Sequence, residues 1–570
     1  MQKFKLFLIA VIVISASVRL YQLGSHISAA YGDEVAIAYN AYSILKTGRD
    51  EFSEFMPLQF RSWGDQKNPV YIYTVSLFQI FFGINNWSVR LPSAISGILA
   101  VYLTYHITLI LINTTNPQSN QSVAKSIALI AALLLALNPW HLHISRGGYE
   151  ANMALTLGLG GILFLLRWLK LQQKVDQPWL AKNTILPLML FGFASYTYYT
   201  TKMFIPLIAF WILLWGSCIV WVSRPNLNIK KTILSATIFL LGLFVISIPY
   251  IYLALFSSGQ ARFASINIFA NTGVAQRVNE ERGFWQGPAW LGELVINKPI
   301  MWARDFTHYF LDNLGVLYWY VFGDSTLRYT IGNHGVFYTF EAPFFILGLM
   351  FMFSYNKRLW LFLVSWLIIA VLPTSFVGKS YSLRSLAMLP VPMIFVAYGV
   401  VHSLLYLNSI SKKLANKFSK MLAISFCATP SFLFVLSAIN FLLRYSYAYP
   451  TYGYYWYDGI FKDIYQYTKE REEQVDNILI TNHFGKAQLY YAYYNTTDPS
   501  YYQQQSRANQ DSNTQELVKL DKYYFGDINE ENISLLQGKT LIIAPPYTLS
   551  GEEILAKDDR RVLFVSKIKD

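Results

Sequence analysis

Two adjacent carboxylates, Asp33 and Glu34, follow the first apolar stretch of the chain closely, in the segment Tyr31-Gly32-Asp33-Glu34. A positioned carboxylate can take the proton of a hydroxyl nucleophile, which contributes about a hundredfold to ten-thousandfold in rate. Ionisable side chains beside an apolar span are costly to keep there and therefore indicate a function. Taken alone, the pair is equally consistent with two solvated acids in a loop.

Basic side chains that suit an anionic headgroup occur in three later segments. Lys67 precedes Asn68-Pro69, Arg146 precedes two glycines, and Arg384 opens an apolar run. Cations of this kind can hold an anionic group, and glycines beside Arg146 allow close backbone approach. Each residue also has a plainer interpretation, because a lysine can extend toward lipid headgroups and an arginine can anchor the start of a helix.

The elements that must position these residues are membrane spans. Of the 570 residues, 54% are hydrophobic and only 14% are charged. Windows of about 19 residues predict about eleven spans. The apolar runs lie at 4–20, 88–112, 124–140, 151–169, 184–200, 204–223, 232–254, 340–355, 359–377, 385–407 and 421–443. The first is expected to be an uncleaved span, and the shorter run 70–82 is expected to form an interfacial or re-entrant helix.

The connecting segments predict the orientation of the chain. Lysine and arginine gather on alternate short connections, which marks that side as cytoplasmic and places the N-terminus inside. The opposite side then receives the first loop (21–89), the turn at 141–150, the long segment 256–338, the turn at 378–384 and everything after about 444. We therefore expect a multi-pass plasma-membrane protein whose candidate chemistry lies on the extracytoplasmic face.

The net charge of +13 does not point to nucleic acid, because the basic residues are dispersed among the spans. Cys218 and Cys427 both fall within apolar runs and indicate neither a disulfide framework nor a metal site.

After Arg444 the composition changes. Short apolar runs at 477–480, 540–544 and 562–565 predict strands, and 485–494 has helical spacing. The expected organisation is a transmembrane domain over 1–443 and a small extracytoplasmic α/β domain over 444–570.

The order of these motifs resembles the GT-C glycosyltransferase superfamily. A short first span, an outer loop that opens with Asp33-Glu34, Lys67-Asn68-Pro69 before a half-helix, and Arg90-Leu91-Pro92 at the next span all stand on one side. The second outer turn, 141–150, resembles the Ser-Arg and acidic element of that superfamily. The pattern is similar to the protein O-mannosyltransferase and lipid A aminoarabinose transferase branches, although relatives often have consecutive prolines after the lysine.

The resemblance implies a GT-C fold and transfer of a sugar from a polyprenyl-phosphate carrier to an acceptor hydroxyl, with inversion. The implied catalytic residues are Asp33, as general base, and Glu34. The implied phosphate-binding residues are Lys67, Arg146 and Arg384. The implied sugar-binding or acceptor-binding residues are Glu150, His143 and Tyr71. If a magnesium, manganese or calcium ion takes part, Asp33, Glu34 and Glu150 are its expected ligands. The sugar stays open, as does the choice among lipid, glycan and protein acceptors.

A polytopic transporter or lipid flippase is the alternative. Such a protein is expected to carry charged residues in mid-span, near broken helices and often in repeated halves. Here most charges lie at span ends or in loops, and the sequence has no evident internal repeat. The transferase interpretation is therefore favoured.

Overall fold

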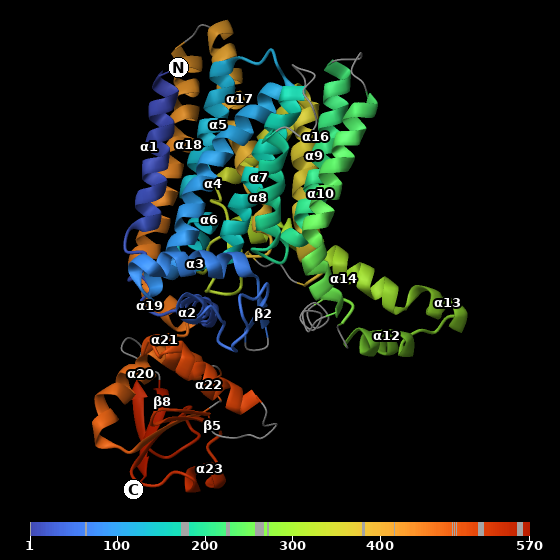
Figure 1. The fold of residues 1–570 in the computed structure, drawn as a ribbon. Coiled ribbons are helices and arrows are strands. Elements are labelled where there is room, and N and C mark those ends of the chain that lie inside the picture. Colours follow the sequence, from blue (N-terminus) through green and yellow to red (C-terminus); the bar gives the residue numbers. More distant parts are fainter. Residues whose placement is uncertain are drawn as a thin grey trace. The chain divides into compact units, whose positions relative to one another are not determined.

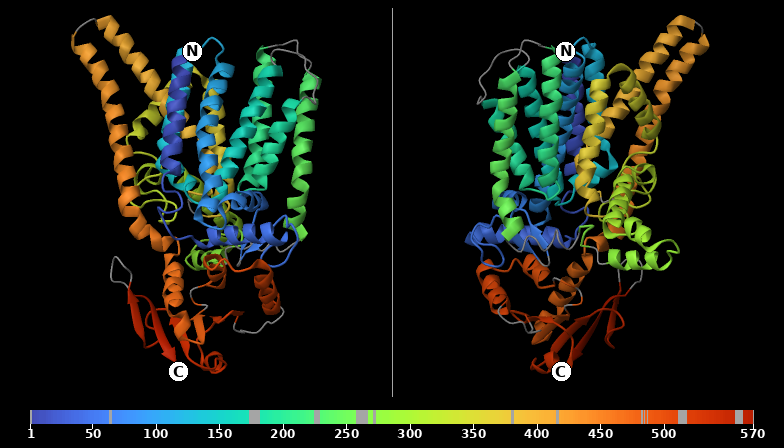
Figure 2. Two further views of the ribbon diagram at one scale, coloured as in Figure 1. Left: turned by 60° about the vertical axis from the view of Figure 1, so that its left-hand side comes forward. Right: turned by 90° about the vertical axis from the view of Figure 1, so that its right-hand side faces the viewer.

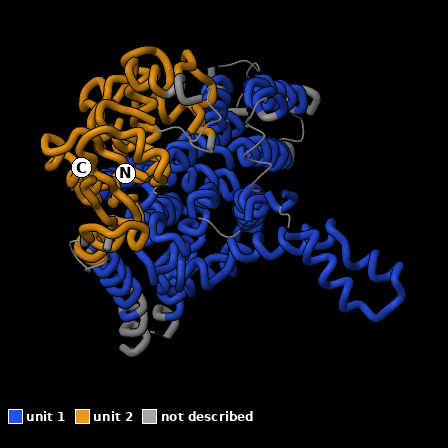
Figure 3. Tube along the Cα trace, turned by 90° about the horizontal axis from the view of Figure 1, so that it is seen from below, with its two compact units in different colours: residues 1–21, 93–442 blue, residues 22–92, 443–570 orange. Residues whose placement is uncertain are grey.

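The fold is described from a computed structural model of the chain (Figure 1). It describes residues 2–62, 65–172, 182–223, 229–256, 267–270, 273–378, 382–414, 417–481, 483, 485, 487–510, 518–555 and 562–569. Contacts divide the chain into two compact units, coloured in Figure 3. Unit 1 comprises Met1–Tyr21 and Ser93–Leu442, and unit 2 comprises Gln22–Pro92 and Leu443–Asp570.

Unit 1 is built mainly from apolar helices, most of them long, that run side by side (Figure 2). They are α1 (Gln2–Leu20), α4 (Asn86–Thr115, which begins in unit 2), α5 (Gln121–Leu137), α6 (Pro139–Ser145), α7 (Glu150–Gln172), α8 (Lys182–Ser195), α9 (Thr201–Ser223), α10 (Ile229–Phe256), α15 (Glu341–Tyr355), α16 (Lys357–Ser375), α17 (Val391–Leu414) and α18 (Lys417–Leu443). The segment between α10 and α15 adds α12 (Gly273–Gly283), α13 (Ala289–Val295), α14 (Lys298–Asn313) and the π-turn η1 (Tyr318–Phe322).

Every apolar run of the sequence coincides with helix, but the expected eleven spans are too many. Within the described ranges, seven helices are long and apolar enough to cross a membrane, or eight if α5 and α6, bent by 57° at Asn138, form one broken span. The remaining runs are α1, which carries Lys3, Lys5 and Arg19, and the short helices α8 and α15. A multi-pass membrane protein is thus confirmed.

Glycines allow α15 and α17 to approach each other closely in unit 1. A Cβ atom on Gly348 of α15 would lie 1.9 Å from the carbonyl oxygen of Phe395, and one on Gly399 of α17 would lie 2.1 Å from that of Phe344. Small residues that let helix backbones touch are typical of packing between membrane helices. The α15–α17 pair is fixed in this way.

Unit 2 combines the first loop with the C-terminal segment. The loop contains α2 (Gly32–Thr47), the hairpin strands β1 (Phe60–Ser62) and β2 (Asp65–Lys67), and α3 (Pro69–Phe82). The expected helix at 70–82 is therefore confirmed. The C-terminal part contains η3 (Arg444–Ala448), α19 (Tyr449–Trp456), α20 (Gly459–Arg471), η4 (Glu472–Gln474), α21 (Ala487–Tyr494), α22 (Pro499–Gln510) and α23 (Glu530–Ser534). Helix α2 packs against α3, α21 and α22, so the first loop is embedded in this unit.

A six-stranded mixed sheet forms the core of the C-terminal part, in the order β4-β5-β3-β6-β8-β7. Strand β3 (Asn477–Thr481) lies in parallel between β5 (Tyr523–Gly526) and β6 (Thr540–Ala544), and every residue of β3 and β6 is buried. The antiparallel strands are β4 (Val518–Leu520), β7 (Glu552–Leu555) and β8 (Val562–Lys569). The three strands expected from sequence are confirmed, whereas β4, β5 and β7 were missed because they are short or polar.

The predicted division at 443/444 stays a prediction. The third boundary between the two units, after Leu442, falls one residue earlier than predicted, but unit 2 also contains the first loop together with the C-terminal part. That grouping follows from packing between residues more than 400 positions apart, which a division along the sequence does not express.

Candidate active site

The candidate site is centred on the first turn of α2. Gly32, Asp33 and Glu34 open this helix, and each of the three takes a partner from a different part of unit 2. At its other end, Gly48 adopts a left-handed conformation with φ 69° and donates its N–H to the carbonyl of Ile44, which ends the helix. The two acidic residues of the sequence motif are therefore held on a regular element rather than a loop.

Asp33 pairs with Lys67, which lies at the end of β2. The Lys67 Nζ atom is 2.7 Å from Asp33 Oδ1, and the lysine side chain is 4% exposed while the carboxylate is 36% exposed. A buried cation beneath a half-exposed carboxylate orients that carboxylate and leaves it in reach of a ligand. The structure thus brings together the expected base and one of the expected phosphate-binding residues.

Glu34 points to a different cation. Arg90 donates from Nε to Glu34 Oε1 and from Nη2 to Glu34 Oε2, both at 2.8 Å, and both side chains are almost completely buried. The guanidinium also donates to the carbonyls of Ile27 and Ala29, each at 2.7 Å. This fork-to-fork pair ties α2 to the preceding segment and to the start of α4, so its geometry is that of a structural ion pair.

Tyr71 makes a structural hydrogen bond within unit 2. Its buried hydroxyl donates to the carbonyl of Val89 at 2.7 Å, which joins α3 to the start of α4. Pro69 at the first positions of α3 fits there because a helix leaves its first N–H groups unpaired.

Arg146, in unit 1, ends helix α6. Its Nη1 donates to the carbonyl of Val18 at 2.6 Å and to that of Arg19 at 3.3 Å, so the cation covers carbonyls at the C-terminal end of α1. Arg19 itself is fully buried and bonds to the carbonyl of Ala136 at 2.8 Å and to His141 Nδ1 at 3.0 Å. The arginine expected at a carrier phosphate therefore also holds two helix ends together.

His143 and Glu150 belong to the same part of unit 1. His143 Nε2 lies 2.8 Å from the carbonyl oxygen of Arg328, which also accepts the hydroxyl of Tyr149 at 2.9 Å. Glu150 is half-buried and opens α7. The contacts of His143 and Tyr149 hold the segment around Arg328 against the turn at 141–150.

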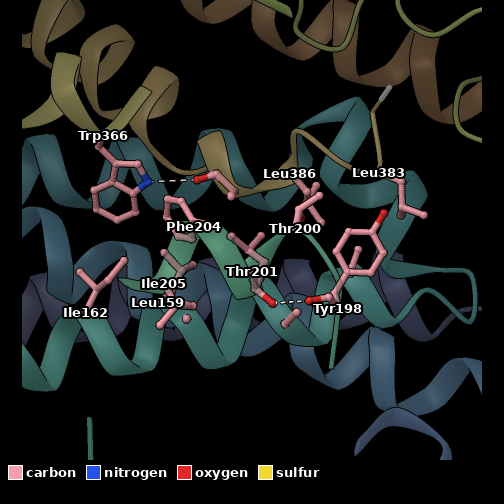
Figure 4. A pocket seen from close by; sticks show the side chains of 15 residues that line it. Leu159, Ile162, Tyr198, Thr200, Thr201, Phe204, Ile205, Trp366, Leu383 and Leu386 are labelled. Atoms are coloured by element: carbon pink, nitrogen blue, oxygen red, sulfur yellow. Dashed lines mark hydrogen bonds between the residues drawn. The ribbon is translucent and has the colours of Figure 1, made fainter. Parts of the chain in front are cut away.

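Arg384 lies half-buried in an anchored turn of unit 1. Ser382 donates from its backbone N–H and its hydroxyl to Asp324 Oδ2, at 2.7 and 2.8 Å. Further along, Trp366 donates to the carbonyl of Ala387 at 3.0 Å, beside an apolar pocket between α7 and α9 that Leu383 and Leu386 also line (Figure 4). Residues 379–381, which the sequence analysis grouped with this turn, lie outside the described residues.

The expected carboxylate ligands do not gather around one ion. Among the residues that the structure describes, no group of three or more His, Cys, Asp or Glu side chains is arranged to hold a metal. Asp33 and Glu34 are adjacent in sequence, yet each faces its own cation. These two carboxylates are therefore not arranged as ligands of one ion.

Sequence reasoning missed two partners of the acidic motif. The sequence marks Arg90 only as part of the Arg90-Leu91-Pro92 motif, whereas in the structure it is buried and pairs with Glu34. Asp458, whose Oδ2 accepts the N–H of Gly32 at 2.9 Å, lies 426 positions further along and carries no local motif. For Glu34, an arginine at the start of an apolar run was the only sequence signal, and it does not specify a partner.

Comparison with known proteins bears on the fold. No model of a known protein family matches the sequence. A putative mannosyltransferase, YycA of Bacillus subtilis (strain 168), is 26% identical over 168 residues, which cover 29% of this chain and 22% of that protein. The chain therefore matches only about a fifth of the length of that relative.

The solved structures cover nearly the whole chain. ArnT from Cupriavidus metallidurans in the apo state superposes with a TM-score of 0.51 at 14% identity, over 97% of both chains. The same protein bound to undecaprenyl phosphate gives a TM-score of 0.50 at 13% identity, over 98% of this chain and 97% of that chain. This chain therefore has the same fold as ArnT, and the resemblance expected from the motifs is confirmed at the level of the fold.

Proposed function

We propose that the protein transfers a sugar from a polyprenyl-phosphate carrier to an acceptor hydroxyl on the extracytoplasmic face of the membrane. The observation that carries the proposal is the Asp33–Lys67 pair, in which a half-exposed carboxylate and a buried ammonium meet at 2.7 Å. The GT-C fold and the segment shared with a putative mannosyltransferase support it.

The chemistry needs one base and a site for an anion. Asp33 accepts the proton of the acceptor hydroxyl as its oxygen bonds to the anomeric carbon, and the bond from that carbon to the phosphate oxygen breaks. The phosphate leaves as a stable anion, so no acid has to protonate it, unlike the alkoxide released in glycoside hydrolysis. Attack opposite the leaving group inverts the anomeric centre.

In this proposal Lys67 orients the carboxylate of Asp33, and its positive charge favours the departing phosphate of the donor. Arg146 and Arg384 remain candidates for binding a carrier phosphate, and His143 and Glu150 for binding the sugar or acceptor. Glu34 we assign to positioning, because both of its oxygens accept N–H groups of Arg90.

The test uses purified protein in lipid nanodiscs with a panel of polyprenyl-phosphate sugars, mannose first, and mixed lipid, glycan and peptide acceptors. Transfer is followed by mass spectrometry, and the anomeric configuration of the product by NMR. We expect one donor class to be consumed, with inversion. Retention of configuration, or no transfer from any donor, contradicts the proposal.

Lys67 variants sharpen the test. We expect Lys67→Ala to lower turnover at least tenfold, because it removes a cation that meets both groups. Lys46→Ala is the matched control, since Lys46 is an exposed lysine near the end of α2. Equal turnover of the two variants excludes a role for Lys67 in the reaction.

A further inference from the structure

The C-terminal part of unit 2 reaches the first turn of α2 through one carboxylate. Asp458 Oδ2 accepts the backbone N–H of Gly32 at 2.9 Å, directly before Asp33. The first N–H groups of a helix have no partner within the helix, and a side-chain oxygen at the N-cap normally accepts one of them. Here the N-cap residue is Tyr31, whose side chain makes no such bond, so the acceptor comes from Asp458.

Asp458 is itself held in place. The hydroxyl of Tyr490 donates to the same Oδ2 atom at 2.7 Å, and the Tyr490 ring stacks on Phe461 with centroids 3.9 Å apart. The backbone of Asp458 has φ 53°, a left-handed conformation that side-chain-bearing residues other than Asn and Asp rarely adopt.

A second contact joins the same two segments. The ring of Tyr31 meets the ring of Tyr457 edge to face, with centroids 5.6 Å apart. Tyr31 and Tyr457 directly precede Gly32 and Asp458, respectively. The junction therefore consists of two successive residues on each side, one pair packed and one pair hydrogen-bonded.

We propose that Asp458 is a positioning residue for the active site, and that the C-terminal domain acts on the reaction by capping α2 and so fixing where the Asp33 carboxylate points. Three consecutive residues of α2 are then held independently: Gly32 by Asp458, Asp33 by Lys67 and Glu34 by Arg90. The role of Asp458 in catalysis rests on the proposed function, whereas the capping itself does not. A displacement of about 1 Å at a reacting group can lower turnover about a hundredfold.

The variant pair Asp458→Gly and Asp458→Asn tests this. Glycine removes the carboxylate but adopts the left-handed backbone freely, so the loss of the cap is separated from backbone strain. Asparagine keeps an acceptor oxygen and tolerates the same backbone. We expect Asp458→Gly to lower kcat by about tenfold to a hundredfold with the donor KM changed less than threefold, and Asp458→Asn to restore most of it.

Asp463→Asn is the matched control. Asp463 lies on α20 and accepts the hydroxyl of Tyr454 at 2.9 Å, so both carboxylates of the comparison bind a tyrosine hydroxyl. We expect its kcat to stay within twofold of the unsubstituted protein. An equal loss in Asp458→Gly and Asp463→Asn means general loosening of the domain and overturns the proposal.

Hydrogen exchange by mass spectrometry gives a readout that is independent of turnover. We expect amides of the first turn of α2, at Gly32 and the residues after it, to exchange at least tenfold faster in Asp458→Gly. Unchanged exchange overturns the capping role. Faster exchange in a protein that transfers no sugar retains the capping and refutes only the proposed function, so the two failures are distinguishable.

Discussion

The isosteric variant Glu34→Gln separates a structural role from a catalytic one. Opposite unit charges 2.8 Å apart attract by about 6 kcal/mol at an effective dielectric constant near 20. Burial of the two ions costs several kcal/mol for each, so the intact pair contributes little net stability. Removing one charge leaves Arg90 buried and uncompensated, which typically costs about 3 to 5 kcal/mol. We expect a loss of that size in the free energy of unfolding.

The assay is reversible unfolding in mixed detergent, followed by tryptophan fluorescence. Glu281→Gln is the matched control, because Glu281 pairs with Arg304 at 3.0 Å with both side chains at least 39% exposed, and such pairs contribute at most about 1 kcal/mol. The double variant Glu34→Leu/Arg90→Met should regain part of the lost stability, because it removes both charges. It should not regain all of it, because methionine cannot donate to the carbonyls of Ile27 and Ala29. If Glu34→Gln unfolds like the unsubstituted protein yet transfers no sugar, Glu34 is catalytic and our assignment is refuted.

Two further variants test architectural contacts of the predicted site residues. Tyr71→Phe loses the hydrogen bond to the Val89 carbonyl and should lower the free energy of unfolding by about 0.5 to 1.5 kcal/mol, with the acceptor KM unchanged. A raised acceptor KM in a fully stable variant would instead assign Tyr71 to ligand binding. Arg146→Ala loses the charged hydrogen bond to the Val18 carbonyl and should lower the free energy of unfolding by about 1.5 to 3 kcal/mol in the same assay. Unchanged stability together with lost donor binding would assign Arg146 to the phosphate alone.

Local pattern was sufficient for the elements of this fold that carry their own signal. Apolar run length predicted the helices, and the runs at 477–480 and 540–544 predicted the two strands that are buried throughout. The predicted span count exceeds the seven or eight found in the described ranges because α1 carries three basic residues and because α8 and α15 are only 14 and 15 residues long.

The candidate site was predictable only in part for the same reason. Asp33 and Lys67 stand in one loop and were both selected by residue type and order, and the structure pairs them. The partners of Gly32 and Glu34 come from the far C-terminal part and from the start of α4, so no spacing rule links them. Burial also changes the interpretation of Glu34 and Tyr71, whose polar atoms serve protein contacts that residue type alone does not reveal.

The most direct test of the reaction itself is single-turnover transfer by Asp33→Asn, with binding of the polyprenyl-phosphate sugar measured in the same sample. Glu54→Gln, an exposed acid of the same loop, is the control. Loss of a base predicts turnover lowered by about a hundredfold or more with donor affinity within a few-fold of the unsubstituted protein. Transfer at the unsubstituted rate in Asp33→Asn would contradict the account.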